Sequence, residues 1–375
     1  MVIQPYVSAY RLPFFQRLEG ELTSRDIRLS VAHGTPWGKD AWRADARQLP
    51  GAIELPQFTW ELAGRHFVYR KLGALATRCD ALILSQALHT LDSYLPVLRP
   101  SGPPVGLWGH GGTYNRSHSA PLRTMKRLFT NRARWFFAYT ELGARQVISQ
   151  GFPAQRVTVV RNTIDTTRLA ADREEVADDQ LTALRRRLGL RRGRTALYIG
   201  GLDASKRIPF LLAAAESAAR ALPGFRLVIA GDGSQRRLVE EAVRRGETVR
   251  YAGRVADEDK ALLGAAADVM MVPGAVGLVA VDSLALGVPL VTTSDAPHGP
   301  EFEYLEDGRN ALIVDGSDLD GYVAAVVGLL GAPERLTALR TGCRSGTQEY
   351  SAEGMARRFA DGVEGLLQPL RGEPR

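Results

Sequence analysis

The chain has 375 residues, of which 45% are hydrophobic and 24% are charged. This composition is typical of a soluble globular protein, and the length indicates about two domains. Two cysteines, Cys79 and Cys343, are too few for a disulfide framework or a zinc cluster and fit a reducing cytoplasm. No apolar run reaches the roughly 18 residues that span a bilayer, and the N-terminus lacks signal-peptide features, so we expect a cytoplasmic protein.

The net charge of +7 is unevenly distributed along the chain. Residues 1–165 contain 21 Lys and Arg against 11 Asp and Glu, or +10, and the remainder contains 27 against 30, or −3. A basic front half favours an anionic partner, such as a membrane surface, a phosphorylated acceptor or nucleic acid. No stacking or groove-reading motif accompanies the charge, so we expect no nucleic-acid partner.

Short apolar runs predict six strands in the first half of the chain. They are "VIQPY" (2–6), "IRLSVAH" (27–33), "ALILS" (81–85), "VGLWG" (105–109), "RWFFAYT" (134–140) and "VTVVR" (157–161). We assign residues 1–165 to an N-terminal Rossmann-like domain on this pattern.

Residues 116–137, "RSHSAPLRTMKRLFTNRARWFF", contain six Lys and Arg and no acidic residue. Leu122, Met125, Leu128 and Phe129 recur there at helical spacing, which predicts a basic amphipathic helix. Residues 116–134 then either adhere to anionic lipid or a phosphate-bearing acceptor, or present a solvated basic face. In both cases we expect the apolar stripe to pack on the sheet.

The second half repeats the strand pattern more clearly. Residues 166–194 are charged throughout and predict an interdomain connection with one helix. Six apolar runs then follow at 195–200, 225–230, 249–253, 268–272, 289–293 and 310–314. Helical segments alternate with these runs, which indicates a parallel sheet covered on both faces over residues 195–350. Residues 351–375 predict a final helix, with packing against the N-terminal domain as one option.

Polar and glycine-rich segments follow several of these strands, where ligands bind in open α/β sheets. Lys206 and Arg207 in "GGLDASKRI" precede a helix and suit a diphosphate, although a solvated pair at a helix start is the alternative. Asp232 in "IAGDG" ends the next strand in a tight turn, and a lone Gly-x-Gly of this kind favours a plain turn over a ligand site. Each segment alone is weak evidence for a nucleotide site.

Residues 272–293, "VPGAVGLVAVDSLALGVPLVTT", predict a strand, a glycine turn and a buried helix. The turn and the helix start comprise Gly274, Gly277, Leu278 and Val279. Amide groups at such a helix start form an anion site. Asp282 lies one turn further, where its carboxylate either accepts hydrogen bonds from ribose hydroxyls or favours the helix dipole.

Taken together, the ordered motifs resemble one enzyme family. They are "GGLDASKRI", "IAGDG", "YAGRV", "VPGAVGLVAVDSLALGVPLV" and "HGPEFEYLEDGRNALIV", preceded by "LWGHGG" and "AYTELGARQVISQGFPAQRVTVVRNTID". The series resembles the retaining, nucleotide-sugar-dependent glycosyltransferases of group 1 (family 4) over about residues 100–350. The resemblance implies the α/β GT-B fold, in which two Rossmann-like, doubly wound domains face a central cleft. It also implies an acceptor-binding N-terminal domain and a donor-binding C-terminal domain.

The resemblance also implies roles for particular residues. His110 would contact the sugar and Lys206 would hold the donor diphosphate, and we take these two as the catalytic positions. The donor-binding positions are Gly200, Arg207, Asp232, Gly253, Arg254, Val255, Gly274, Gly277, Leu278, Val279 and Asp282. We expect no metal ion and no other cofactor, because cationic side chains and helix N-termini offset the charge of the leaving diphosphate.

Five further residues are candidates for the acceptor side. Tyr10, Arg11 and Phe14 are chosen only because they follow the first predicted strand. His298 lies in a loop rich in Pro and Gly after a strand. Glu301 either approaches the sugar or caps the following segment.

The chain departs from the family pattern at three places. The first glutamate of the family's Glu-x(7)-Glu motif would fall at Gly274, and the arginine before the phosphate lysine would fall at Gly201. The usual glycine pair of the first loop is replaced by "QPYVSAYRLPFF". Arg207, Arg254 or Arg11 are the candidates to supply the missing positive charge.

We therefore predict a transferase that moves a hexose-type sugar from a nucleoside diphosphate to a glycan, lipid-linked or small-molecule acceptor. No paired carboxylates are placed for double displacement, so attack occurs on the face that the leaving diphosphate vacates. The alternatives are a GT-B nucleotide-sugar epimerase and a non-catalytic nucleotide-binding relative. We expect the protein in the cytoplasm, with contact to the inner face of the membrane as one option.

Overall fold

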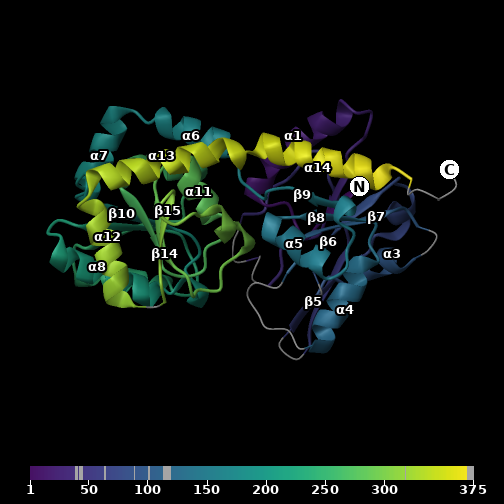
Figure 1. The fold of residues 1–375 in the computed structure, drawn as a ribbon, viewed down its shortest axis with the longest axis horizontal. Helices are drawn as coiled ribbons and strands as arrows, with labels where there is room; N and C mark the ends of the chain where they lie inside the picture. Colours follow the sequence, from purple (N-terminus) through teal and green to yellow (C-terminus); the bar gives the residue numbers. More distant parts are fainter. Residues whose placement is uncertain are drawn as a thin grey trace. The chain divides into compact units, whose positions relative to one another are not determined.

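The computed structural model describes residues 1–38, 41, 45–62, 65–87, 89–99, 102–112, 120–316 and 318–369. The chain divides into two compact units (Figure 1). The first domain comprises Met1–Asn162 with Ala352–Arg375, and the second comprises Thr163–Ser351. Each contains a parallel sheet covered by helices, which confirms the predicted fold class. The central cleft between the domains stays a prediction.

The first domain contains a seven-stranded sheet in the order β3-β2-β1-β6-β7-β8-β9. Its strands are β1 (Val2–Gln4), β2 (Val31–His33), β3 (Ile53–Glu54), β6 (Leu82–Ser85), β7 (Val105–Gly109), β8 (Trp135–Ala138) and β9 (Val157–Val159). Every neighbouring pair is parallel. The six predicted runs each contain one strand, whereas the two-residue β3 is too short to stand out in the sequence.

Helices from both ends of the chain cover one face of this sheet. They are α1 (Leu12–Thr23) and α14 (Ala352–Leu367), which lie against each other in Figure 1. Phe359 of α14 lies among aromatic rings, with centroid distances of 4.9 Å to Trp108 and 4.4 Å to Phe137. It also contacts Phe14 of α1 at 5.4 Å. The end of the chain therefore completes the core of the first domain.

The helices α3 (Tyr94–Leu98), α4 (Ala120–Asn131) and α5 (Glu141–Ser149) lie on the other side of the first domain. Of the predicted amphipathic segment, residues 116–119 lie outside the described residues. In α4, Leu122 and Phe129 are half-buried, but Met125 and Leu128 are 46% and 60% exposed. The prediction that the whole stripe packs on the sheet is wrong, because Met125 and Leu128 lie on the solvent-exposed side of α4.

The antiparallel pair β4 (Gln57–Leu62) and β5 (Arg65–Arg70) was not predicted. Arg70 at its end is 1% exposed and forms an ion pair of 3.0 Å with Asp92. The Arg70 guanidinium also donates to the backbone carbonyl of Gln4, at 2.7 Å. Because a buried ion pair is costly to break, these contacts fix the hairpin to the first strand of the sheet.

The second domain contains a six-stranded parallel sheet in the order β12-β11-β10-β13-β14-β15. The strands are β10 (Thr195–Ile199), β11 (Arg226–Ala230), β12 (Val249–Gly253), β13 (Val269–Val272), β14 (Leu290–Thr293) and β15 (Ala311–Val314). Each lies within a predicted run. The order is that of the doubly wound dinucleotide-binding fold, whose ligands bind where the strand order reverses.

Helices cover both faces of this second sheet (Figure 1). One face carries α8 (Ile208–Ala221), α9 (Arg236–Arg245) and α12 (Leu319–Leu330), and the other carries α10 (Asp257–Ala266), α11 (Val279–Leu286) and α13 (Pro333–Glu349). Short 3-10 helices occur at Ala9–Arg11, Gly73–Thr77, Leu91–Ser93, Ala154–Arg156, Ala204–Lys206 and Pro300–Tyr304.

Residues 166–194 differ from the predicted connection with one helix. They contain two helices, α6 (Thr166–Glu174) and α7 (Asp178–Leu188), and both belong to the second domain. Leu169 and Leu184 are buried and anchor these helices. Because most residues around these two leucines are charged, the sequence shows no apolar pattern that would have predicted both helices.

No single helix among the described residues has the length and hydropathy to cross a membrane. The bent pair formed by 319–330 and 333–367 meets those two criteria only when both helices are taken together.

We predict that Phe359→Ala destabilises the first domain by about 3–5 kcal/mol, because it leaves a cavity inside the aromatic cluster. Urea denaturation of the full chain measures this loss. Phe58→Ala is the matched control, since Phe58 is 58% exposed on β4 and its removal creates no cavity. Equal losses in the two variants would contradict the packing role of Phe359.

Candidate functional site

The loop after β13 lies directly against the loop after β10 in the second domain. The amide of Ala275 donates to the carbonyl of Ser205 at 2.8 Å, and the Lys206 ammonium donates to the carbonyl of Ala275. A Cβ atom added at Gly274 would lie 2.3 Å from the carbonyl carbon of Lys206. The structure thus brings the predicted phosphate lysine to the predicted phosphate loop.

This contact accounts for the departure from the family at position 274. Backbone atoms of Lys206 occupy the space that any side chain at Gly274 would need. Backbone atoms in a packed interior cannot shift without a large free-energy cost, whereas the end of a flexible side chain can. A glutamate therefore does not fit at this position in this chain.

The start of α11 presents amide groups that have no partner among the described residues. The first backbone bond of the helix runs from the Ala280 amide to the Gly277 carbonyl at 2.9 Å. The amides of Gly277, Leu278 and Val279 make no recorded hydrogen bond in this part of the chain, and the side chain of Leu278 caps none of them. All three residues are half-buried, so their amide groups form an accessible, positively polarised helix end.

Asp282 lies one turn further along α11 and is 8% exposed at its side chain. Its carboxylate forms an ion pair of 3.2 Å with Lys260 of α10. This partner was not predicted, because Lys260 lies 22 positions earlier in the chain and carries no motif. Binding of ribose hydroxyls by Asp282 stays a prediction.

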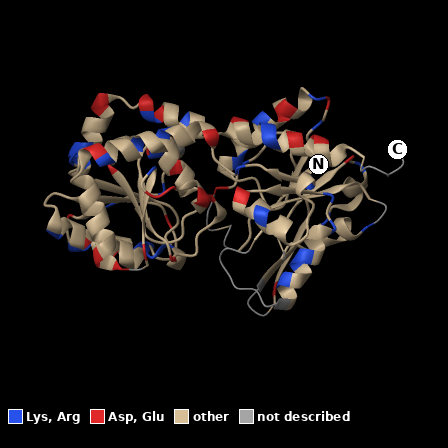
Figure 2. Cartoon of the chain, in the orientation of Figure 1, with Lys and Arg blue, Asp and Glu red and all other residues tan. Residues whose placement is uncertain are grey.

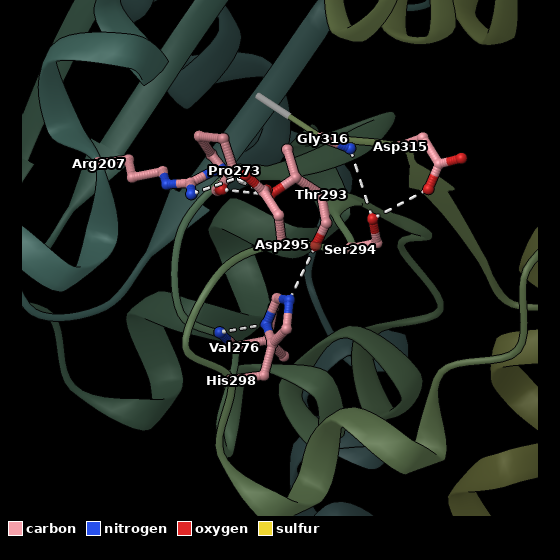
Figure 3. A network of polar contacts seen from close by, with 9 residues as sticks. All are labelled: Arg207, Pro273, Val276, Thr293, Ser294, Asp295, His298, Asp315 and Gly316. Carbon is pink, nitrogen blue, oxygen red and sulfur yellow. Dashed lines mark hydrogen bonds and ion pairs between the residues drawn. The ribbon is translucent and has the colours of Figure 1, made fainter. Parts of the chain in front are cut away.

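Arg207 connects the start of α8 to the end of β14 (Figure 3). Its guanidinium forms two hydrogen bonds with the Asp295 carboxylate, at 2.9 and 3.1 Å, and a third with the Thr293 hydroxyl at 3.2 Å. The hydrogen bond from Arg207 lowers the pKa of Asp295. These bonds use three of the five guanidinium N–H donors and join two loops. Binding of the donor diphosphate by Arg207 stays a prediction.

His298 holds the loop before α11 through both of its ring nitrogens (Figure 3). The Val276 amide donates to Nδ1 at 3.2 Å, so Nδ1 is unprotonated and Nε2 donates to the Thr293 carbonyl at 2.8 Å. The ring stacks on Phe302 at 3.8 Å, and burial lowers its pKa. This neutral imidazole is hydrogen-bonded through both ring nitrogens and positions the loop. The place of His298 on the acceptor side stays a prediction.

Glu301 is buried beside the start of α11. Its Oε2 lies 3.8 Å from the position that a Cβ atom at Gly277 would occupy. The carboxylate therefore lies near these half-buried amide groups. Its predicted approach to the sugar stays a prediction.

The remaining predicted donor residues lie at the ends of β10, β11 and β12. Arg254 and Asp232 form an ion pair of 3.4 Å, and Asp232 also accepts from the Gly233 amide at 2.8 Å. Gly253 ends β12 with a φ of 72°, and Val255 after it is half-buried. Gly200 directly follows β10, and its amide donates to the carbonyl of Ala230. These loops lie at one edge of the sheet, as parallel strands require.

The first domain has its own cavity, of about 140 Å³, at the carboxyl ends of its strands. It is lined by Gln4, Pro5, Tyr6, Ser8, Tyr10, Arg11, Ser85, Trp108 and Tyr139. Arg11 is only 3% exposed, and its guanidinium carbon lies 4.5 Å from the Trp108 ring centroid and 5.0 Å from that of Tyr10. It also donates to the Tyr139 hydroxyl at 3.4 Å. The wall of this cavity thus contains a cation, the Arg11 guanidinium, held among aromatic rings.

His110 follows β7 and lies near this cavity. Its ring meets that of Tyr139 edge to face at 4.6 Å. Desolvation, followed by the charges of Lys126 and Arg11, lowers the pKa of His110 to about 4. At that pKa His110 is a neutral imidazole at pH 7. Because the residue is exposed, it can hydrogen-bond a ligand.

The loop after His110 has no room for a side chain at Gly111. A Cβ atom at Gly111, whose φ is 75°, would lie 2.2 Å from the carbonyl oxygen of Gly143. The loop therefore lies directly on the start of α5. Lys126 of α4 adds a hydrogen bond of 2.9 Å to the carbonyl of Gly112.

Of the three residues predicted near the first strand, two line the cavity and one does not. Tyr10 and Arg11 line it, whereas Phe14 is fully buried in the aromatic core and does not reach a ligand. Sequence reasoning missed Trp108 and Tyr139. Both lie at the carboxyl ends of predicted strands, so their place at that edge was the available signal.

Comparison with known proteins identifies the family of this chain. Residues 14–168 match the family Glycosyltransferase Family 4, and residues 193–332 match Glycosyl transferases group 1. The chain belongs to the group 1 (family 4) glycosyltransferases. It is 32% identical over 146 residues to a phosphatidyl-myo-inositol mannosyltransferase of Mycolicibacterium smegmatis, a match that covers 37% of each protein. A D-inositol 3-phosphate glycosyltransferase of Catenulispora acidiphila is 26% identical over 82% of this chain and 73% of its own length.

A solved structure shows the same fold. Anabaena HepE in complex with UDP superposes with a TM-score of 0.68 and 15% identity, over 97% of this chain and 99% of that one. This glycosyltransferase chain thus has the GT-B fold that its motifs predicted.

We predict that Gly274→Glu, which restores the family residue, destabilises the second domain by about 3 kcal/mol or more, because the side chain collides with the Lys206 backbone. It should also abolish stabilisation by a nucleoside diphosphate. Thermal unfolding with and without nucleotide measures both effects. Gly246→Ala is the control, since its Cβ atom would meet open space. A Gly274→Glu variant as stable as the wild type would disprove the steric account.

Proposed function

We propose that this glycosyltransferase moves a hexose-type sugar from a nucleoside diphosphate to an acceptor hydroxyl, with retention of anomeric configuration. The observation that carries the proposal is the start of α11. Three amide groups without a partner in the described chain lie beside a loop that binds the Lys206 ammonium. Such a site suits a diphosphate, because it supplies hydrogen-bond donors and positive charge together.

In the proposed reaction, the acceptor oxygen attacks the anomeric carbon as the bond from that carbon to the diphosphate oxygen breaks. The proton of the acceptor hydroxyl passes to the departing diphosphate oxygen. The amides of Leu278 and Val279 and the ammonium of Lys206 neutralise the charge that develops on the leaving diphosphate. We propose that no metal ion is required, because these groups already offset that charge. Neutral His110 would hydrogen-bond the transferred sugar, as the family resemblance implies.

The acceptor is assigned to the cavity of the first domain. Its Arg11 and its aromatic rings suit an acceptor that combines apolar ring faces with hydroxyl or anionic groups. Glycan, lipid-linked and small-molecule acceptors all meet this description. Retention comes from the family resemblance, and the anomeric proton signals of the product test it.

UDP-sugars are the first donors to test, since HepE structures contain UDP and UDP-glucose. A thermal-shift screen of UDP, GDP, ADP and dTDP identifies the base, because a ligand that binds only the folded state raises the melting temperature. If one nucleoside diphosphate binds but is not released from any of the corresponding nucleotide sugars, a non-catalytic relative is favoured.

We predict that Lys206→Ala lowers nucleotide release from the donor by roughly 100-fold, because it removes one charge beside the leaving group. The rate is measured as nucleoside diphosphate released in the presence of acceptor. Arg220→Ala is the control, since Arg220 lies near the end of α8 and bonds only Ser217 among the described residues. Unchanged turnover in Lys206→Ala would refute the diphosphate assignment.

We also propose peripheral attachment to the cytoplasmic face of an anionic membrane through α4. Arg123, Lys126 and Arg127 lie on this helix, and Figure 2 shows its basic residues. Leu128 and Met125 are exposed on the same helix. Exposed apolar side chains beside cations are the features by which amphipathic helices bind lipid surfaces.

We predict that Leu128→Ser lowers binding to vesicles that contain phosphatidylserine by roughly tenfold, because the leucine no longer buries its apolar surface in the lipid. Flotation of vesicles with and without phosphatidylserine measures the bound fraction. Ile148→Ser is the matched control, an exposed residue of α5 outside the basic segment. Equal binding by both variants and the wild type would exclude α4 as the lipid contact.

A further inference from the structure

We infer that the second domain holds a binding site for a small phosphate-bearing anion, separate from the donor site. The site is a cavity of about 260 Å³ between α6, α7, α10 and α13. It is lined by Arg173, Asp178, Leu181, Arg185, Arg192, Ala265, Ala267, Asp268 and Arg340. This inference does not depend on the proposed function.

Positive charge exceeds negative charge around the cavity. Four arginines line it against two aspartates. The Asp268 carboxylate is already engaged, since it accepts from the Thr195 amide at 3.0 Å and from Arg340 at 3.3 Å. Asp178 is exposed to solvent in the first turn of α7. The protein therefore leaves much of the arginine charge without a carboxylate to offset it.

Several guanidinium groups at this cavity also lack hydrogen-bond acceptors. The Nε atoms of Arg173, Arg185 and Arg340 are buried without a partner in the described part of the chain. Arg173 makes no recorded hydrogen bond or ion pair there, and it is half-buried. Burial, together with the charges of Arg344 and Arg340, lowers its pKa. Buried donors of this kind are normally satisfied, so three around one cavity indicate an absent acceptor.

The donor geometry favours a phosphate group as that acceptor. Guanidinium groups bind phosphate through paired N–H···O bonds, and one phosphate offers acceptors to several arginines at once. The cavity is smaller than the roughly 300–1,000 Å³ of pockets for drug-sized ligands. A phosphomonoester or inorganic phosphate therefore fits the site in both charge and size.

The cavity lies at the opposite edge of the sheet from the candidate donor site. Thr195 is the first residue of β10, and Asp268 directly precedes β13, so the cavity lies at the amino ends of the strands. The donor residues follow the carboxyl ends, about 13 Å away along β10. Because α6 and α13 lie next to the two points where the chain crosses between domains, the bound anion would tie the entering segment to the leaving one.

The test is thermal unfolding of the full chain in sodium phosphate, in glycerol 3-phosphate, and in sodium chloride of matched ionic strength. We expect a saturable rise in melting temperature with either phosphate and not with chloride. The double variant Arg173→Gln/Arg185→Gln should lose this rise. In chloride alone it should melt at or above the wild-type temperature, because mutual repulsion and buried unpaired donors are removed.

Two controls separate this site from other effects. Arg186→Gln/Arg187→Gln changes exposed arginines of the same helix α7 and should keep the phosphate response. Lys206→Ala should keep it as well, since the donor loop is not involved. A larger rise with glycerol 3-phosphate than with phosphate would assign the ester as the ligand, and an equal rise would assign the phosphate group alone. A response that persists in the Arg173/Arg185 variant, or that chloride reproduces, would overturn the inference.

Discussion

The candidate donor site depends on one close backbone contact, between Gly274 and Lys206. Without a side chain at 274, two loops from different strands approach within hydrogen-bonding distance and share the bond from Ala275 to Ser205. His298 then fixes the next residue, Val276, to the end of β14. The start of α11 follows from this arrangement, because its amide groups point where the loop places them. A missing glutamate thus reflects a different loop packing, and not simply the loss of a functional group.

The two candidate sites use different means to hold a ligand. In the second domain the donors are mainly backbone amides at a helix end, positioned by buried loop contacts. In the first domain they are side chains, with the Arg11 guanidinium held among the rings of Trp108, Tyr10 and Tyr139. Backbone donors suit a group common to every donor, such as a diphosphate. Side chains vary more readily, which suits acceptors that differ from one enzyme to another.

Much of the fold could be predicted because parallel strands buried on both faces form continuous apolar runs. All six strands of the second sheet lie within such runs. The hairpin β4–β5 was missed although Phe58, Trp60 and Leu62 alternate with polar residues, a pattern typical of a half-exposed strand. Partners distant in sequence were beyond prediction, as with Lys260 beside Asp282 and Asp295 beside Arg207. Such ion pairs depend on how helices and loops pack, which no local pattern records.

The connectivity of the chain has a consequence for its synthesis. The second domain is one continuous segment, Thr163–Ser351, whereas the first requires α14 from the end of the chain. A ribosome that releases residues in order completes the second domain while Phe14, Trp108 and Phe137 still lack the helix that covers them. The first domain, most of which is synthesised first, therefore completes its fold last. A nascent chain that stalls before α14 exposes the aromatic core of this domain to solvent.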